Sequence, residues 1–258
     1  MRTGASLSDL PATGKQFGMA AAIPELVATM CTDLVLWQTR LDVDATEIAR
    51  CAGLLSDDEK LRAGRFRFAR DQRRFIVARG MLRRLLGEHL GMPPTAIGFR
   101  YTSNGKPLLA DDTARIQFNV AHSEERALYA FSSTVQPGVD IEFTNRAIEC
   151  DELAQRFFTR NEYAALQKLK PVDRKRAFLA CWTRKEAVVK ATGDGLSLPF
   201  HQFEVTVEAD AEPRIIAANV RQIADCSLYS ADVGADYVAA VATYRERGLE
   251  NIQSRQTE

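Results

Sequence analysis

Residues 181–193 read CWTRKEAVVKATG and are the most informative stretch of this chain. Small and apolar residues recur there at helical spacing, and Gly193 is typical of a helix end. The stretch therefore predicts the last turns of a helix that carries one carboxylate, Glu186, close to two lysines, Lys185 and Lys190. Taken alone, Glu186 and Lys190 are four residues apart and typical of an ordinary surface ion pair.

A second acidic segment, PGVDIE at residues 137–142, gives this helix a chemical context. Pro137 and Gly138 are typical of a strand that follows a turn. Asp140 and Glu142 are two residues apart, so on a strand they face the same side of the sheet. An isolated pair of this kind is more often a solvated strand face than a site.

Three carboxylates from the predicted strand and helix, Asp140, Glu142 and Glu186, suit a divalent cation that holds a phosphate. Mg²⁺ binds one or two carboxylates together with phosphate oxygens. Two roles are open for Glu186, a metal ligand and a general base. Lys185 and Lys190 have the charge to neutralise a phosphate, so the combination predicts a site for a phosphate-containing ligand.

Two further segments fit a phosphate-rich ligand. The sequence NGKP at 104–107 predicts a turn that presents Lys106, and FNVAHS at 118–123 places His122 at the end of an apolar, strand-like run. Taken singly, each segment has a simpler explanation, a hairpin connection with a solvated lysine and a structural histidine. Ser123 lacks the GxSxG context that a serine hydrolase requires.

The rest of the chain mixes strands and helices without a strict alternation, which favours an α+β fold. Ser56 and Glu59 have the spacing of a capping box and predict a helix start, and helical spacing continues to Gly87 or Gly91. Pro171 predicts a break between two later helices. We expect strands near residues 35–43, 97–101, 127–131, 138–143, 203–207 and 237–242, and helices near residues 150–169 and 173–191.

Two similar segments indicate an internal duplication. RFIVAR at 74–79 and RAFLAC at 176–181 lie at corresponding points of a repeat of about 100 residues. We expect a loosely ordered N-terminal extension over residues 1–30, an N-terminal α/β half over 31–136, a C-terminal α/β half that carries the metal site over 137–247, and a tail over 248–258.

Composition narrows the class of protein. The 258 residues carry 34 basic and 34 acidic side chains, so net charge predicts no partner, although residues 60–84 hold ten basic residues and one acid. Five cysteines without a CxxC pair argue against a zinc knuckle and a disulfide framework, and they fit a reducing cytosol. The apolar patch at 17–23 is too short to span a bilayer, so we expect a cytoplasmic protein that does not bind membranes.

Four segments, taken in order along the chain, resemble the Sfp-type 4′-phosphopantetheinyl transferases: GKP at 105–107, FNVAHS at 118–123, GVDIE at 138–142, and WTRKE at 182–186 continuing to Lys190. The resemblance covers residues 55–199. It implies two similar α/β halves in one chain, related by a pseudo-twofold axis, with the active site in the cleft between them. It also implies a monomer, because one chain forms the whole cleft.

The resemblance further implies a reaction. The serine hydroxyl of an apo acyl or peptidyl carrier protein attacks the β-phosphorus of coenzyme A, and 3′,5′-ADP leaves. Asp140, Glu142 and Glu186 match the family's ligands for Mg²⁺, with Mn²⁺ as an alternative, and Glu186 also matches the proposed base. Lys190 matches the lysine that contacts the phosphates and aids the leaving group, and we expect Lys185 to bind coenzyme A beside it.

Three more residues match positions that hold the 3′-phosphate and pyrophosphate of coenzyme A, namely Arg74, Lys106 and His122. Two other functions stay open. The basic run at 60–84 is compatible with a nucleic-acid-binding module, although aromatic residues there are few and no RNA or DNA motif is present. A metal-dependent phosphohydrolase would use the same acids. The ordered motifs favour the transferase, with coenzyme A and a carrier protein as partners and no nucleic acid.

Overall fold

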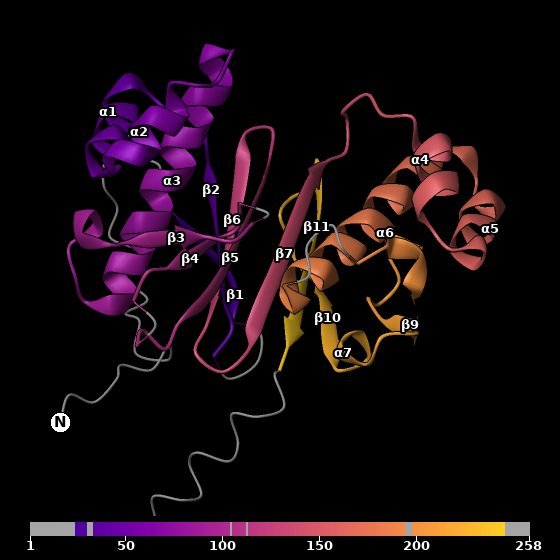
Figure 1. Ribbon diagram of the computed structural model, residues 1–258. Helices are drawn as coiled ribbons and strands as arrows, with labels where there is room; N and C mark the ends of the chain where they lie inside the picture. The colour runs from indigo at the N-terminus through magenta and orange to yellow at the C-terminus, as the bar shows by residue number, and fades with distance from the viewer. Residues whose placement is uncertain (1–23, 30–32, 104, 112, 194–197, 246–258) are drawn as a thin grey trace, which may run out of the picture.

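The computed structural model describes residues 24–29, 33–103, 105–111, 113–193 and 198–245, whose longer strands form two antiparallel sheets (Figure 1). The N-terminal sheet has the order β1 (Glu25–Thr29), β2 (Val35–Arg40), β6 (Arg126–Ser132), β5 (Gln117–Ser123). The C-terminal sheet has the order β10 (Cys226–Ser230), β11 (Tyr237–Tyr244), β7 (Gln136–Phe143). Two short hairpins pair β3 (Phe99–Tyr101) with β4 (Pro107–Leu109) and β8 (Phe203–Val205) with β9 (Ile215–Ala218).

Helices separate these strands in both halves of the chain. The first half contains α1 (Ala45–Leu54), α2 (Asp57–Ala63) and α3 (Ala69–Leu90). The second half contains α4 (Cys150–Phe157), α5 (Arg160–Lys168), α6 (Pro171–Thr192) and α7 (Arg221–Ala224). The mixed α/β composition agrees with the sequence prediction. Within the described ranges, no helix combines the length and the apolar composition that crossing a membrane requires.

The two main sheets follow the same strand order relative to the chain. Apart from β1, which adds a fourth strand to the N-terminal sheet, the first strand (β2 or β7) pairs with the last (β6 or β11), and the last pairs with the strand before it (β5 or β10). Each half also contains one helix of 22 residues, α3 or α6. In Figure 1, α6 lies across β7 and β11, so it covers one face of the C-terminal sheet.

Local sequence signals fix the ends of the helices. Ser56 and Glu59 form the predicted capping box at α2, where the Glu59 carboxylate accepts the Ser56 N–H at 3.0 Å. A second capping box, Thr159 with Glu162, begins α5 and divides the single helix expected over residues 150–169 into two. Pro171 begins α6, because a first-turn residue needs no N–H donor. Gly193 ends α6 with φ of 80°, in the left-handed region that favours glycine.

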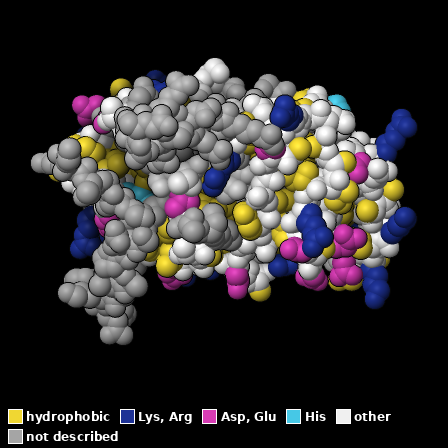
Figure 2. Space-filling model, turned by 90° about the horizontal axis from the view of Figure 1, so that it is seen from below, with side chains coloured by type: hydrophobic (Ala, Val, Ile, Leu, Met, Phe, Trp, Pro, Cys, Tyr) yellow, Lys and Arg dark blue, Asp and Glu magenta, His cyan; other side chains and the backbone are white. Residues whose placement is uncertain are grey.

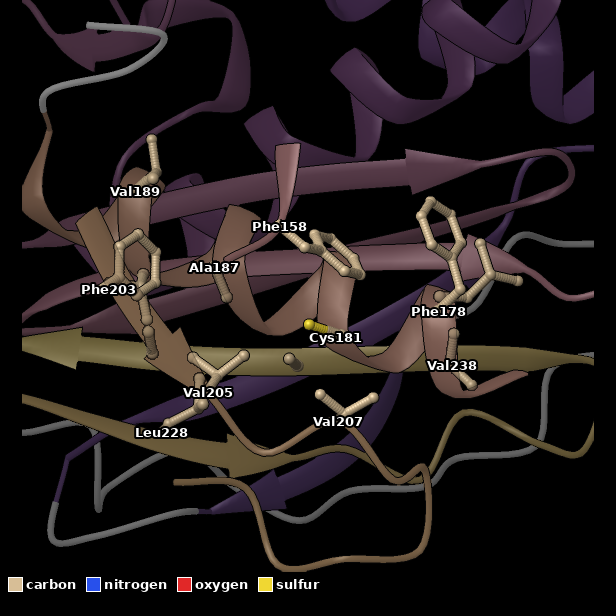
Figure 3. Close-up of a cluster of buried hydrophobic side chains, with 14 of the residues drawn as sticks. Phe158, Phe178, Cys181, Ala187, Val189, Phe203, Val205, Val207, Leu228 and Val238 are labelled. Carbon is tan, nitrogen blue, oxygen red and sulfur yellow. The ribbon is translucent and has the colours of Figure 1, made fainter. Parts of the chain in front are cut away.

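Three apolar clusters stabilise this arrangement. The C-terminal cluster packs α6 against β8, β11 and the residues around them, and Figure 3 shows Phe178 and Cys181 of the helix near Val205 and Val238. The N-terminal cluster packs α3 against β6. A third cluster takes buried residues from β2, β5 and β6 and from β7 and β11, so the two sheets share one core. Lys and Arg side chains lie scattered among acidic and apolar ones on the face seen in Figure 2.

The structure corrects the expected N-terminal boundary. Residues 1–30 were expected to be a loose extension, but Glu25–Thr29 form strand β1, which pairs with β2 from Glu25 opposite Gln38 to Thr29 opposite Val35. The strand is mostly exposed, so its sequence lacks the apolar alternation of a half-buried strand. Residues 1–23 and the expected tail at 248–258 lie outside the described residues. Five further elements were not predicted from the sequence, namely α1, β4, β9, β10 and α7.

Candidate active site

One face of α6 lines a cavity of about 710 Å³. Trp182, Glu186 and Lys190 are four residues apart in turn, so they form one stripe along the helix, and all three are half-buried. The opposite wall comes from the N-terminal half, with Lys106 from the β3–β4 connection and Phe118 from β5. The cavity therefore has side chains of both halves around it.

Lys190 links the helix to the acidic strand. Its Nζ donates to Asp140 Oδ1 at 2.6 Å and to the carbonyl oxygen of Val139 at 3.2 Å. Asp140 is 8% exposed, and its second oxygen, Oδ2, is buried and accepts no hydrogen bond among the described residues. Burial raises the pKa of Asp140 to about 7 although Lys190 opposes the shift, and the charges of Glu186 and Glu142 raise it further. This carboxyl group therefore lacks a second positive partner.

Glu186 is the least engaged of the three carboxylates. Within the described part of the chain, no hydrogen bond to its carboxylate is formed. Burial raises the pKa of Glu186, Lys190 partly offsets that shift, and the charge of Glu142 adds to it. A partly desolvated carboxylate that faces a cavity without a fixed partner is available to accept a proton or to bind a cation.

Glu142 already has two partners. Its Oε2 accepts hydrogen bonds from Arg146 Nη1 at 2.6 Å and from Ser123 Oγ at 2.9 Å. Among the residues that the structure describes, no three His, Cys, Asp or Glu side chains are grouped closely enough to hold a metal ion. Asp140, through its free Oδ2, and Glu186 fit a cation. Glu142 can bind a cation only after it releases Arg146 or Ser123.

Lys106 and His122 bring hydrogen-bonding nitrogen atoms from the N-terminal half. Lys106 Nζ donates to the carbonyl oxygen of Lys190 at 3.1 Å, and burial, together with the charge of Lys190, lowers its pKa. His122 lies near the end of β5. Loss of water around it lowers its pKa, the charges of Lys190 and Arg74 lower it further, and Glu142 acts in the opposite direction. The structure therefore brings Lys106, His122 and Lys190 to one region.

Arg74 lies near this region but is already paired. Its Nε and Nη2 donate to the two carboxylate oxygens of Asp42, each at 2.8 Å, and its Nη1 donates to Glu124 Oε2 at 2.8 Å. These bonds to carboxylates raise the pKa of Arg74, with the bond to Asp42 as the largest cause. Only 15% of the Arg74 side chain is exposed.

Comparison with protein families identifies the chain. Residues 136–242 match the model of the 4′-phosphopantetheinyl transferase superfamily, and residues 42–134 match the model of the 4′-phosphopantetheinyl transferase N-terminal region. The chain belongs to the 4′-phosphopantetheinyl transferase superfamily. The family model for residues 136–242 includes the strand and the helix that carry all three acids.

Curated relatives agree with this assignment. The transferase is 39% identical over 176 residues to the 4′-phosphopantetheinyl transferase HetI of Nostoc sp., a match that covers 67% of this chain and 74% of that protein. It is 28% identical over 208 residues to the 4′-phosphopantetheinyl transferase psf-1 of Bacillus pumilus, covering 80% and 86%. The solved holo-[acyl-carrier-protein] synthase of Thermotoga maritima aligns with 43% of this chain and 63% of its own, at 19% identity and a TM-score of 0.35, which is too low to bear on the fold.

The structure contradicts the expectation that Lys185 of this transferase binds coenzyme A. Lys185 is fully buried, and its Nζ pairs with Glu162 Oε1 at 2.9 Å. It also donates to the carbonyl oxygens of Phe200 at 2.8 Å and Phe203 at 2.6 Å. One residue along a helix rotates the side chain by about 100°. Lys185 therefore points into the core while Glu186 points into the cavity.

The aromatic wall of the cavity was not predicted from the sequence. The Trp182 ring lies 5.2 Å from the ring of Phe200 and 5.8 Å from that of Phe157, both nearly edge to face, and all three residues line the cavity. Phe157 and Phe200 come from segments far from α6 in sequence. The four-residue spacing of Trp182, Glu186 and Lys190 indicates one shared helix face, but only Glu186 and Lys190 were assigned to the site from the sequence.

Proposed function

We propose that this transferase moves the 4′-phosphopantetheine group of coenzyme A to the serine hydroxyl of an apo acyl or peptidyl carrier protein and releases 3′,5′-ADP. The observation that supports this most is the position of Glu186. Its carboxylate has no hydrogen-bond partner among the described residues, it lines a cavity that both halves of the chain contribute to, and Lys190 is one helical turn away.

The repeated strand order supports two related halves with the active site between them. We propose that β2, β6 and β5 correspond to β7, β11 and β10, and that α3 corresponds to α6, about a pseudo-twofold axis. One chain then supplies both walls of the cavity, so we propose a monomer. The absence of a CxxC pair among the five cysteines supports a cytoplasmic location.

The cations of this cleft suit the phosphates of coenzyme A. We propose that Lys106 and His122 hold the pyrophosphate from the N-terminal half while Lys190 holds it from α6. Phosphoryl transfer depends on positioning and on neutralising the charge of the oxygens, so no covalent enzyme intermediate is needed. Lys190 already donates to Asp140, and a phosphate oxygen would become a further acceptor for its ammonium group.

Glu186 is the proposed proton acceptor for the carrier-protein serine. Burial raises its pKa, which brings the basicity of the carboxylate closer to the pH at which it works. Lys190 opposes this shift, so its ammonium group favours the ionised form of Glu186, which is the form that accepts the proton. The serine oxygen forms the new bond to the β-phosphorus, and the bond from that phosphorus to the 3′,5′-ADP oxygen breaks.

Mg²⁺, or Mn²⁺, would be held by Asp140 and Glu186, with Glu142 as a third ligand once it releases Arg146 or Ser123. Bound there, the ion would neutralise the pyrophosphate charge. The buried and unpartnered Oδ2 of Asp140 supports this proposal, because an unpaired carboxylate oxygen in a low-dielectric site is costly without a cation.

Arg74 is the proposed ligand of the 3′-phosphate of coenzyme A. Three of its five N–H groups now bind Asp42 and Glu124, so one N–H on Nη1 and one on Nη2 are left for the phosphate. We expect Arg74→Ala to weaken binding of coenzyme A more than binding of 3′-dephospho-coenzyme A, measured by calorimetry. Equal losses for both ligands would contradict this assignment.

The function is tested with apo carrier proteins of fatty acid, polyketide and nonribosomal peptide synthesis. Intact-protein mass spectrometry should detect the added phosphopantetheine only when the transferase, coenzyme A and Mg²⁺ are all present. No gain in mass on any of these carriers would contradict the proposal. Release of phosphate from small phosphate esters without a carrier would instead identify a phosphohydrolase.

A further inference from the structure

The two main sheets meet along β5 and β7, which lie side by side but belong to different sheets. Two side chains of β5 bind the backbone of β7 at this junction. Asn119 Oδ1 accepts the N–H of Val139 at 3.0 Å, and Ser123 Oγ accepts the N–H of Phe143 at 3.1 Å. These side chains replace two bonds of the backbone ladder that would otherwise join the strands.

The two contacts flank the acidic pair of the active site. Asn119 and Ser123 are four residues apart, as are Val139 and Phe143, so β5 and β7 run parallel and keep the same register between the two contacts. Asp140 and Glu142 lie between the two bonded positions of β7.

Both side chains are buried and committed to this junction. Asn119 is 5% exposed and Ser123 is 8% exposed. Ser123 Oγ also donates to Glu142 Oε2 at 2.9 Å, so one hydroxyl holds both the backbone and the side chain of the acidic strand. Without these groups, the buried N–H of Val139 and the part-buried N–H of Phe143 lose their acceptors, and β7 loses its fixed distance from β5.

We propose that Asn119 and Ser123 are positioning residues that hold the acids of the C-terminal half at a set distance from the proposed phosphate ligands of the N-terminal half. They act through β7 and Glu142, and no step of the reaction requires them to contact the reacting atoms. The inference rests on the proposed transferase function, because the groups that it aligns are the proposed phosphate ligands, Lys106 and His122, and the proposed acids, Asp140 and Glu142.

Ser132 provides a matched control. Like Ser123, it is a buried serine whose hydroxyl accepts backbone N–H groups, here of Thr134 and Val135, and donates to a carboxylate, that of Asp33 at 2.9 Å. It lies at the far end of β6 and contributes nothing to the cavity wall. Ser132→Ala therefore removes a comparable set of bonds from the same sheet without loosening the junction.

The test measures kcat and KM for coenzyme A with an apo carrier protein, together with the thermal unfolding midpoint. Asn119→Ala and Ser123→Ala should each lower kcat by about 10- to 100-fold, because a displacement near 1 Å in an active site has effects of that size. KM for coenzyme A should change by less than about threefold, and Ser123→Thr, which keeps the hydroxyl, should recover kcat. Ser132→Ala should lower the unfolding midpoint and leave kcat unchanged.

If folded Ser123→Ala keeps the wild-type kcat, or if Ser132→Ala loses as much kcat as Ser123→Ala, the proposal is overturned. Ser123→Ala decides the matter if Asn119→Ala does not fold, since it removes a single hydroxyl. Failure of the wild-type protein to modify any carrier would refute the proposed function instead. A transferring wild type with unaffected junction variants would refute only the positioning role.

Discussion

Gly138→Ala is predicted to separate the acidic strand from the helix that carries Glu186 and Lys190. A Cβ atom at Gly138 would lie 2.0 Å from the carbonyl oxygen of Ala187 and 2.4 Å from the backbone nitrogen of Ala191. Both are backbone atoms of α6, so no change of rotamer relieves the overlap. Ordinary contact begins at 3.4 Å, and the helix must therefore move away from β7 by more than 1 Å.

This displacement acts directly on the site. Gly138 and Asp140 share one face of β7, and the bond of 2.6 Å between Asp140 Oδ1 and Lys190 Nζ depends on close contact between strand and helix. A misplacement of about 1 Å lowers kcat by roughly 100-fold, and overpacking of a core costs about 1–3 kcal/mol of stability. We expect both effects, measured by the rate of carrier modification in intact-protein mass spectra and by thermal unfolding.

Gly80→Ala is the control. A Cβ atom there would lie 2.6 Å from Cys51 Cβ and 2.8 Å from Cys51 Cα, so the variant forces apart α3 and α1 within the N-terminal half. It should lose stability like Gly138→Ala but keep kcat. A wild-type transfer rate in folded Gly138→Ala, or an equal loss of kcat in the two variants, would refute this prediction.

Three further predictions follow from the same contacts. Glu186→Gln should lower kcat by at least about 100-fold while calorimetry still detects coenzyme A binding, and full activity would remove Glu186 from the mechanism. Lys185→Met leaves Glu162 buried without its partner, so urea denaturation should show that the free energy of unfolding falls by about 3–5 kcal/mol. The folded variant should keep kcat. A loss of kcat at unchanged stability would contradict the buried, structural role of Lys185. The pKa of Asp140 is raised to about 7 from an ordinary 3.8, so the folded, metal-free protein holds a proton that the unfolded chain releases. Its free energy of unfolding, measured in EDTA, should therefore fall as pH rises through 7, and Asp140→Asn should flatten that part of the curve; identical slopes would contradict the raised pKa.

The sequence allowed the two central elements to be predicted because their signals are local. Gly193 ends α6, Pro137 and Gly138 lie at the start of β7, and the capping box at Ser56 begins α2. The carboxylate of Glu186 and the ammonium group of Lys190 share a helix face by spacing alone. The predicted site also required this helix face to lie close to Asp140, and the bond of 2.6 Å from Lys190 Nζ to Asp140 Oδ1 shows that it does.

The parts that sequence could not supply depend on distant partners. Lys185 was misassigned because its buried partner, Glu162, lies on another helix, and nothing local distinguishes a lysine that faces the core from one that faces a cleft. Arg74 is held by Asp42 and Glu124, which lie 32 and 50 residues away. Strand β1 was not predicted because it pairs with β2 through backbone groups. Such pairing does not require a particular pattern of side chains in an exposed strand.

The most direct measurement compares two products of one reaction, the holo carrier protein by intact mass and 3′,5′-ADP by chromatography. With coenzyme A and Mg²⁺, the wild-type transferase should form both in equal amounts, and Glu186→Gln should form neither at a comparable rate. Release of 3′,5′-ADP without a holo carrier, or undiminished formation of both products by Glu186→Gln, would contradict transfer to a serine that Glu186 deprotonates.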